Sequence, residues 1–378
     1  MFLAWFFYTL LAFAVVGLLP WFLVARWLRG PDLSAFDEPS SRRVTTRTEA
    51  SPEIAKVHGI LANLRKKTGP VGSRGRIHRV REAFDEGFSD TPRDPESLGV
   101  EIRDASAGGV PAEWVLAPGH DPRRRLLYVH GGAFYVGSPK SHRPLTAALA
   151  RRTGAAVLSI DYRLLPESSR RDGIEDCQTA YRWVLEHGPD GPLALDGLFV
   201  AGDSAGGNLT LMLTAWARDE DLRPVDAALA LSPATDSSAT SPTITRNLAT
   251  DVMLGPVFKP LLRFPRSLLR LGTLFGLRIH PCNPLISPVH GNLAGLPPTL
   301  VQASESELLL GDASRYVNKA QAAGSPVELQ TWPGMVHVWQ IFEGVVPEAS
   351  EALDQMAEFV RRNAREDVGA EALRRRPG

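Results

Sequence analysis

The pattern of apolar and polar positions divides the chain into three parts. Residues 1–25 carry no charged side chain and consist mostly of Phe, Leu, Trp, Val and Ala. Residues 31–98 are largely polar and contain one amphipathic stretch over 52–67. After residue 98, short apolar runs alternate with stretches of helical period, which is typical of a mixed α/β domain.

Eight short apolar runs in this last part predict buried strands, over residues 100–102, 112–116, 126–130, 155–161, 198–201, 227–231, 299–303 and 327–331. The stretches between them predict helices over 145–152, 174–187, 205–218, 313–323 and 350–363. These strands are too apolar to face water, so the alternation predicts a mostly parallel central sheet covered by helices on both faces. Catalytic groups are then expected at the carboxyl ends of the strands.

The apolar N-terminal residues are long enough to form a helix that crosses the ~30 Å hydrocarbon layer of a bilayer. A cleaved signal peptide would need a basic start and a small-x-small site at the end of a shorter apolar stretch, whereas the only clear match lies mid-stretch at residues 12–14. We therefore predict a single-pass membrane anchor over residues 1–29. Basic residues follow this span and none precedes it, which predicts a cytoplasmic catalytic part; they are Arg26, Arg29, Arg42, Arg43 and Arg47.

Composition excludes several classes of function. Lys plus Arg and Asp plus Glu both number 42, so no net charge favours nucleic-acid binding. The two cysteines, Cys177 and Cys282, lie far apart, and neither a CxxC motif nor a Cys/His cluster surrounds them. Neither a disulfide framework nor a zinc site is expected. We predict no cofactor, no metal and no nucleic-acid partner.

The turn Gly202-Asp203-Ser204-Ala205-Gly206 joins a predicted strand to a predicted helix. A serine exposed on such a sharp turn needs a glycine two residues away on each side, because a Cβ there would collide with the adjoining strand and helix. The same pattern also fits a strand-to-helix turn whose serine has no catalytic role, so the other motifs in the sequence are needed to distinguish the two. We predict Ser204 as a catalytic nucleophile.

A second glycine-rich turn follows the strand predicted over residues 126–130. Attack on an ester carbonyl places negative charge on oxygen, and each main-chain N–H aimed at that oxygen contributes about 2.7–4 kcal/mol. The predicted oxyanion donors are the N–H groups of Gly132 and Ala133, with Gly131 as a further candidate. Ala205, directly after the nucleophile, is the remaining donor.

Taken in order, these motifs resemble the hormone-sensitive-lipase-like (bacterial family IV) esterases and lipases of the α/β-hydrolase fold. The matching segments are His130-Gly131-Gly132-Ala133-Phe134, Asp161-Tyr162-Arg163-Leu164-Leu165-Pro166-Glu167, Gly202-Asp203-Ser204-Ala205-Gly206-Gly207-Asn208, Asn283-Pro284-Leu285-Ile286-Ser287-Pro288, Leu296-Pro297-Pro298 and Pro333-Gly334-Met335-Val336-His337. One departure is Ala133, where the family often has a third glycine. The resemblance covers residues 98–365 and leaves the N-terminal segment unexplained.

The resemblance implies a domain plan. The catalytic α/β-hydrolase core would comprise residues 98–232 and 284–366, interrupted by a helical cap over 233–283. The polar pattern of residues 30–97 predicts a linker plus a few covering helices, which by resemblance would cover the active site together with the insertion. The basic sequence at residues 374–376 predicts a flexible tail over 367–378. Asp203 and the segment 161–163 are also family landmarks, and we expect them to fix loops rather than to react.

His337 is the predicted catalytic base. It follows the strand predicted over 327–331, which places it at the same sheet edge as the nucleophile. Neutral imidazole can take the serine proton and return it to the leaving alcohol. The order of serine, acid and histidine along the chain agrees with this fold.

Three carboxylates compete for the role of the acid that orients His337. By resemblance the family usually has an aspartate at the position of Glu307, and Asp312 matches a later family aspartate. Glutamate serves this role in many hydrolases of the fold. We predict Glu307, with Glu305 and Asp312 as alternatives.

The predicted cap is apolar and basic, with no acidic residue between Asp251 and residue 280. Such a segment fits either ordinary cap packing or contact with anionic lipid headgroups. The sequence as a whole predicts a serine ester hydrolase that forms an acyl-enzyme on Ser204 and acts on apolar or lipid-like esters. The alternatives are an acyltransferase with the same intermediate and a binding protein on an inactive hydrolase scaffold.

Overall fold

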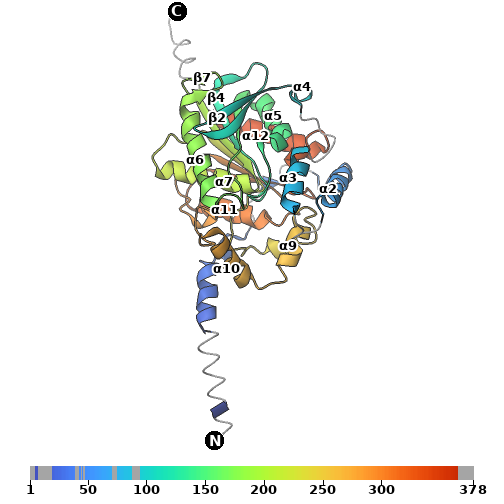
Figure 1. Cartoon of the computed structure of the whole chain (residues 1–378), viewed down its shortest axis with the longest axis vertical. Coiled ribbons are helices and arrows are strands. Elements are labelled where there is room, and N and C mark those ends of the chain that lie inside the picture. The colour runs from blue at the N-terminus through green and yellow to red at the C-terminus, as the bar shows by residue number, and fades with distance from the viewer. Residues whose placement is uncertain are drawn as a thin grey trace, which may run out of the picture.

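The computed structural model describes residues 5–6, 19–38, 42–43, 45, 47–69, 75–86 and 94–364. In this part of the chain the main sheet has nine strands in the order β1-β11-β10-β9-β8-β4-β5-β3-β2 (Figure 1). The strands are β1 (Arg42–Arg43), β2 (Glu101–Ala107), β3 (Val110–Leu116), β4 (Asp121–Val129), β5 (Ala155–Ile160), β8 (Gly197–Asp203), β9 (Ala227–Leu231), β10 (Thr299–Ser304) and β11 (Val327–Trp332). Neighbours pair in parallel, except that β3 is antiparallel to both β2 and β5. The predicted mostly parallel sheet is confirmed.

Each of the eight predicted strands has a counterpart in this sheet, whereas β1 was not predicted. Its two residues lie in a segment that the sequence predicts to be linker, and they pair in parallel with Gln330 and Thr331 of β11. A two-residue strand is too short to show an apolar period, because only pairing with a neighbour defines it.

Both faces of the central strands are buried, as β4 illustrates, whereas the edge strand β2 is mostly exposed or half-buried, in contrast to the buried strand predicted there. Leu126 and Tyr128 pack on one face and Leu127 and Val129 on the other, and all four are fully buried. Helices α5 (Pro139–Thr153) and α12 (Pro347–Asn363) cover the first face. Helices α6 (Arg170–Glu186), α7 (Ala205–Asp219) and α11 (Leu310–Ala322) cover the second. This two-sided burial explains the continuous apolar character of the strands.

Two helices begin earlier than their apolar period predicts. Ser138 caps α5 by accepting a hydrogen bond from the Ser141 N–H at 3.1 Å, and Ser169 caps α6 in the same way with Asp172 at 3.2 Å. In both cases the side chain of the later residue returns a bond to the cap N–H, so each end forms a capping box. The polar first turns are therefore helical although they bury few apolar side chains.

The remaining helices come from the insertion and from the N-terminal part of the chain. The insertion contributes α8 (Thr243–Arg246), α9 (Gly255–Leu261) and α10 (Arg266–Leu277). The N-terminal part contributes the 3-10 turn η1 (Ser34–Phe36), α2 (Ile54–Thr68), α3 (Arg76–Glu86) and α4 (Pro95–Leu98), and the two further 3-10 turns are η2 (Pro288–His290) and η3 (Trp339–Phe342). Helix α2 buries Val57 and Leu61 in an apolar cluster that includes Trp332 and Trp339. Helix α2 is thus packed on the core.

A helix over residues 19–29 extends away from the domain beside α10 (Figure 1). The Trp27 ring meets the His280 ring edge to face at 4.3 Å, and Leu28 is fully buried. Within the described ranges, no helix has both the length and the apolar character needed to cross a membrane. Most of the predicted anchor, residues 1–4 and 7–18, lies outside those ranges, as does the predicted tail over 367–378.

Candidate active site

Ser204 occupies the turn between β8 and α7 in a sparsely populated backbone conformation, with φ 52° and ψ −111°. Such a conformation costs on the order of 1–3 kcal/mol and persists only where the surroundings enforce it. The two flanking glycines show how tightly the turn is packed. A Cβ on Gly202 would lie 2.5 Å from the Gly206 carbonyl oxygen, and one on Gly206 would lie 1.9 Å from the Val129 carbonyl oxygen.

Gly206→Ala is expected to destabilise the protein by about 3 kcal/mol or more, because the obstacle is backbone that cannot move aside without disturbing β4. Gly272→Ala in α10 is the matched control, because nothing lies within 4 Å of its Cβ position. That change should be neutral or stabilising by up to about 1 kcal/mol, as alanine favours helix. Thermal or urea unfolding measures both; equal stability of the two variants would contradict the packing described for the turn.

The loop after β4 lies beside Ser204 in an unusual conformation. Gly132, Ala133 and Phe134 have positive φ angles of 117°, 55° and 66°. A Cβ on Gly132 would lie 2.0 Å from the Val136 carbonyl oxygen, so this position requires glycine. Gly132 and Ala133 both line the cavity that contains Ser204. Ala133, which replaces the family's third glycine, therefore adopts a left-handed conformation in spite of its side chain.

The carboxylate of Asp203 fixes the start of this loop. Its Oδ1 accepts hydrogen bonds from the Gly131 N–H at 2.9 Å and from the Tyr128 hydroxyl at 2.6 Å, and it lies 3.4 Å from His142 Nε2. Burial alone would raise the pKa of Asp203, but His142 and Tyr128 outweigh burial and lower it. The N–H of Gly131 donates to Asp203, so it is not available to an oxyanion. The prediction of Gly131 as an oxyanion donor is therefore wrong, and Gly131 holds the loop instead.

His337 lies in the loop between β11 and η3, and its ring is buried. Its Nδ1 is 2.6 Å from Glu307 Oε2, and Glu307 Oε1 accepts the Ser304 N–H at 2.8 Å. Burial disfavours the imidazolium, but the hydrogen bond and charge of Glu307 outweigh burial and raise the pKa of His337. Nε2 is buried with no hydrogen-bond partner in the described part of the chain, while His337 and Ser204 line one cavity.

The other two candidate acids have different partners. Glu305 accepts a hydrogen bond from the Thr331 hydroxyl at 3.1 Å. Asp312 is buried and accepts the N–H groups of Thr235 and Asp236, both at 3.0 Å. Burial raises the pKa of Asp312 well above its ordinary value. The structure thus brings Glu307 to His337 and places Asp312 under the start of the cap.

Asp251 was not predicted, yet it joins the cap to the segment that contains Glu307. Its Oδ2 accepts the Leu308 N–H at 2.9 Å, and its Oδ1 accepts the N–H groups of Met253 and Leu254 at 3.0 and 2.8 Å. Met253 and Leu254 line the cavity. The one sequence signal is that Asp251 is the last acidic residue within the predicted cap, and this signal does not reveal its partners.

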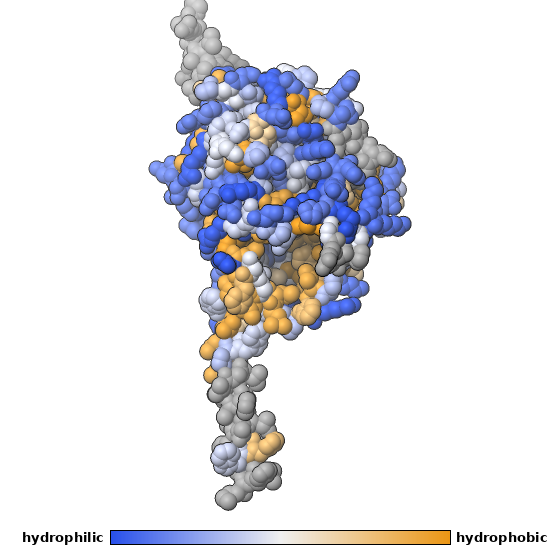
Figure 2. Space-filling model, viewed as in Figure 1, coloured by the Kyte–Doolittle hydropathy of each residue, from blue (hydrophilic) through white to orange (hydrophobic). Residues whose placement is uncertain are grey.

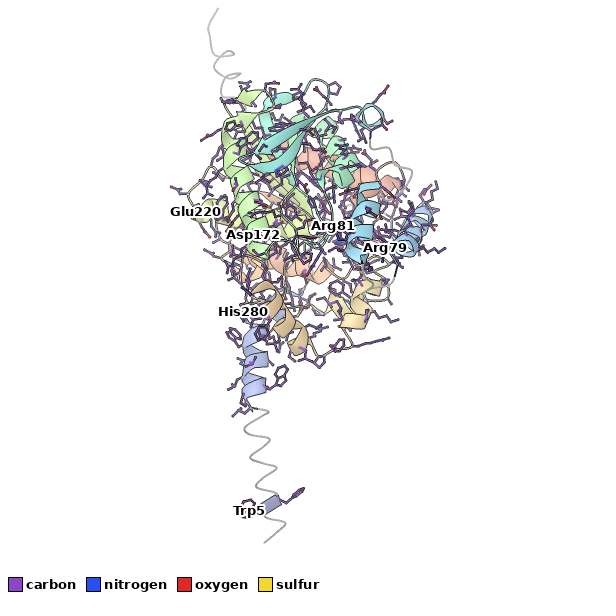
Figure 3. The ribbon with its side chains drawn as sticks, viewed as in Figure 1. Trp5, Arg79, Arg81, Asp172, Glu220 and His280 are labelled. Carbon is purple, nitrogen blue, oxygen red and sulfur yellow. The ribbon has the colours of Figure 1, made fainter. Side chains whose placement is uncertain are left out.

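The cavity over Ser204 has a volume of about 710 Å³, within the usual range for small-molecule sites. Its walls are mostly apolar and come from α2, α3 and α9; they include Leu61, Leu64, Ile77, Val80, Phe84, Pro256 and Val257. Arg81 of α3, labelled in Figure 3, fixes one wall by donating to the Tyr135 carbonyl oxygen at 2.8 Å and to Glu167 at 2.8 and 3.0 Å. No group of three or more His, Cys, Asp or Glu side chains in the described ranges could hold a metal ion.

Comparison with known proteins agrees with this geometry. The profile of a family described as alpha/beta hydrolase fold matches residues 126–341. An acetyl-hydrolase of Streptomyces hygroscopicus is 36% identical over 316 residues, which cover 82% of this chain and 97% of that protein. LipF of Mycobacterium tuberculosis, a carboxylesterase/phospholipase, is 35% identical over 255 residues, covering 66% of each chain.

A crystal structure of an esterase from the bacterial hormone-sensitive lipase family superposes with a TM-score of 0.72 and 32% identity. The match covers 83% of this chain and 99% of that one. The nucleophile turn, the glycine-rich loop and the histidine loop all fall within the matched family region. The chain therefore belongs to the hormone-sensitive-lipase-like (bacterial family IV) esterases, serine carboxylic-ester hydrolases of the α/β-hydrolase fold.

Proposed function

We propose that Ser204, His337 and Glu307 form the catalytic triad of this esterase. His337 Nε2 takes the hydroxyl proton as Ser204 Oγ attacks the ester carbonyl, and Glu307 stabilises the resulting imidazolium. The imidazolium then protonates the leaving alcohol, which leaves an acyl group on Ser204. His337 next deprotonates a water molecule, which attacks the acyl carbonyl and releases the acid.

The N–H groups of Gly132, Ala133 and Ala205 are the proposed oxyanion donors. Ala205 is the first residue of α7, and the first N–H groups of a helix have no partner within that helix. In this proposal the positive end of the helix dipole would also stabilise the developing oxyanion. The observation that best supports the proposed triad is the buried Glu307–His337 pair beside the Ser204 cavity.

The pH dependence of kcat/KM tests the assignment of base and acid together. His337 must be neutral to act as a base, so activity should rise with pH through a midpoint above about 6.5, the ordinary pKa of histidine. In Glu307→Gln the carboxylate that raises this pKa is absent, so the midpoint should move to lower pH while the maximum falls. Initial rates across the imidazole range check this; an unchanged midpoint in the variant would contradict the pairing.

The apolar cavity supports apolar or lipid-like esters as substrates. The relative LipF has phospholipase in its name, which agrees with a lipid-like ester but says nothing of this chain's own head group. We expect kcat/KM to increase with acyl length until the chain fills the cavity. A series of esters of increasing acyl length, measured with and without vesicles, gives the preferred length and shows whether a lipid interface matters; a preference for the shortest polar esters would contradict the proposal.

For the N-terminal segment, we propose a single-pass membrane anchor over residues 1–29 with the catalytic domain on the cytoplasmic side. The uncharged apolar sequence and the arginines that follow it support this topology. Full-length protein should stay with membranes after alkaline carbonate washing, and protease added outside intact cells should not cleave the domain. Release by the wash would contradict the anchor, and cleavage in intact cells would contradict the orientation.

A further inference from the structure

Helix α10 exposes apolar side chains and buries an arginine, which is the reverse of the usual arrangement in a surface helix. Its side chains Leu268 and Phe275 are 45% and 72% exposed, whereas Arg270 is only 8% exposed. Arg270 Nε donates to the Ser238 carbonyl oxygen at 2.6 Å, so the arginine binds inward. A helix on the surface of a domain surrounded by water buries its apolar side and exposes its charges. The outer side of α10 is therefore suited to apolar surroundings.

Other exposed apolar side chains gather around the same place. Among the described residues, every large exposed hydrophobic side chain except Tyr135 and Leu193 belongs to the N-terminal segment or to residues 257–275 of the cap. The cap members are Val257, Leu261, Phe264, Leu268 and Phe275, which together define the cap face. Figure 2 shows apolar residues concentrated over this end of the molecule. Contiguous apolar surface of this kind marks a site of contact.

The exposed charges that the cap segment itself carries beside the cap face are basic. Lys259, Arg263 and Arg278 are exposed there. The sequence contains no Asp or Glu between Asp251 and Glu305. Apolar side chains interspersed with exposed cations are complementary to a bilayer that contains anionic lipids, where each basic residue contributes about 1 kcal/mol near the surface.

The N-terminal segment leaves the domain from this same end. The helix over residues 19–29 contacts the cap region through Trp27 and His280, which is labelled in Figure 3. Residues 1–18, which precede this helix, contain no charged side chain and are mostly apolar. The segment that we propose as the anchor would thus hold the cap face against the membrane rather than turn it away.

The cavity also reaches the cap face. Val257 of α9 lines the cavity and is 40% exposed, and its neighbour Pro256 lines the cavity too. One helix therefore forms both a wall of the acyl site and part of the apolar surface.

We infer that the cap face docks on an anionic lipid bilayer and that membrane-dissolved esters enter the cavity beside α9. The inference rests on the proposed function for the hydrolysis itself and for the anchor. It adds that the cap, and not only the anchor, contacts lipid. A second copy of the chain is the other occupant that the test distinguishes.

The test uses full-length enzyme reconstituted in vesicles of phosphatidylcholine with or without phosphatidylglycerol. The double variant Phe264→Ser/Phe275→Ser removes the two most exposed cap side chains, and Leu193→Ser, an exposed leucine outside the N-terminal segment and the cap, is the control. Each enzyme is given a long-chain ester dissolved in the vesicles and a short water-soluble ester. We expect the double variant to hydrolyse the membrane ester about tenfold or more slowly than wild type and the short ester at the wild-type rate. We also expect wild type to act faster on vesicles that contain phosphatidylglycerol, and Arg263→Glu to lose this preference.

Equal rates of wild type and double variant on the membrane ester would overturn the inference and leave the proposed esterase function intact. Failure of the wild type on both esters would instead overturn the proposed function. A wild type that is dimeric in detergent and a double variant that is monomeric would show that a second copy covers the face, which also overturns bilayer docking.

Discussion

Ser204→Ala is expected to lower kcat for ester hydrolysis by about a millionfold, because the acyl-enzyme can no longer form and only binding and the oxyanion donors remain. The backbone should tolerate the change, since alanine fits the same cavity-lining position and the residue makes no side-chain cap bond to α7. Steady-state rates with a chromogenic ester measure the loss, and thermal unfolding checks that the fold is kept.

Ser106→Ala is the matched control, because Ser106 is exposed on β2 at the far edge of the sheet. It should retain wild-type activity. If Ser204→Ala retained more than about a thousandth of the activity, a different nucleophile would have to act.

Glu307→Gln is expected to lower kcat by about 10³- to 10⁴-fold. The side chain keeps its shape, but it loses the negative charge that stabilises the imidazolium, and its NH₂ group can hold His337 in the wrong tautomer. The Ser304 N–H and His337 Nδ1 occupy separate oxygens of Glu307. The amide of glutamine keeps only one acceptor oxygen, so one of these two bonds is lost whichever way the amide turns. Single-turnover acylation measures the effect apart from product release.

Glu305→Gln is the control for this prediction. Glu305 is two residues before Glu307 in the sequence, and its side chain bonds to Thr331. The acylation rate of Glu305→Gln should therefore stay within about threefold of wild type. A larger loss in Glu305→Gln than in Glu307→Gln would assign the acid role to Glu305 and refute the triad proposed here.

The main sheet was predictable because its central strands are buried on both faces, which leaves apolar runs that stand out in the sequence. Features that depend on pairing or on a single side chain were not predictable. The edge strand β1 is defined only by its contact with β11. The first turns of α5 and α6 depend on Ser138 and Ser169, whose capping bonds no apolar period reveals.

The residues of the site were easier to predict than their partners. The glycines around Ser204 follow from sterics, since each Cβ would meet backbone. Gly131 was misassigned because the sequence cannot show that Asp203 turns its carboxylate toward that N–H. Asp251 was missed for the same reason: its importance comes from binding Leu308 across a long sequence separation. Motifs indicate which residues are candidates for the reaction, whereas tertiary packing determines which residues hold them.

The central claim is that Ser204 becomes covalently acylated, and labelling with a fluorophosphonate followed by peptide mapping tests it most directly. The reagent traps a serine only when the base and the oxyanion donors activate it. We predict one phosphonate adduct per chain, on the peptide that contains Ser204, and strongly reduced labelling in His337→Ala. An unlabelled wild-type enzyme that still hydrolyses esters, or an adduct on another residue, would contradict the account.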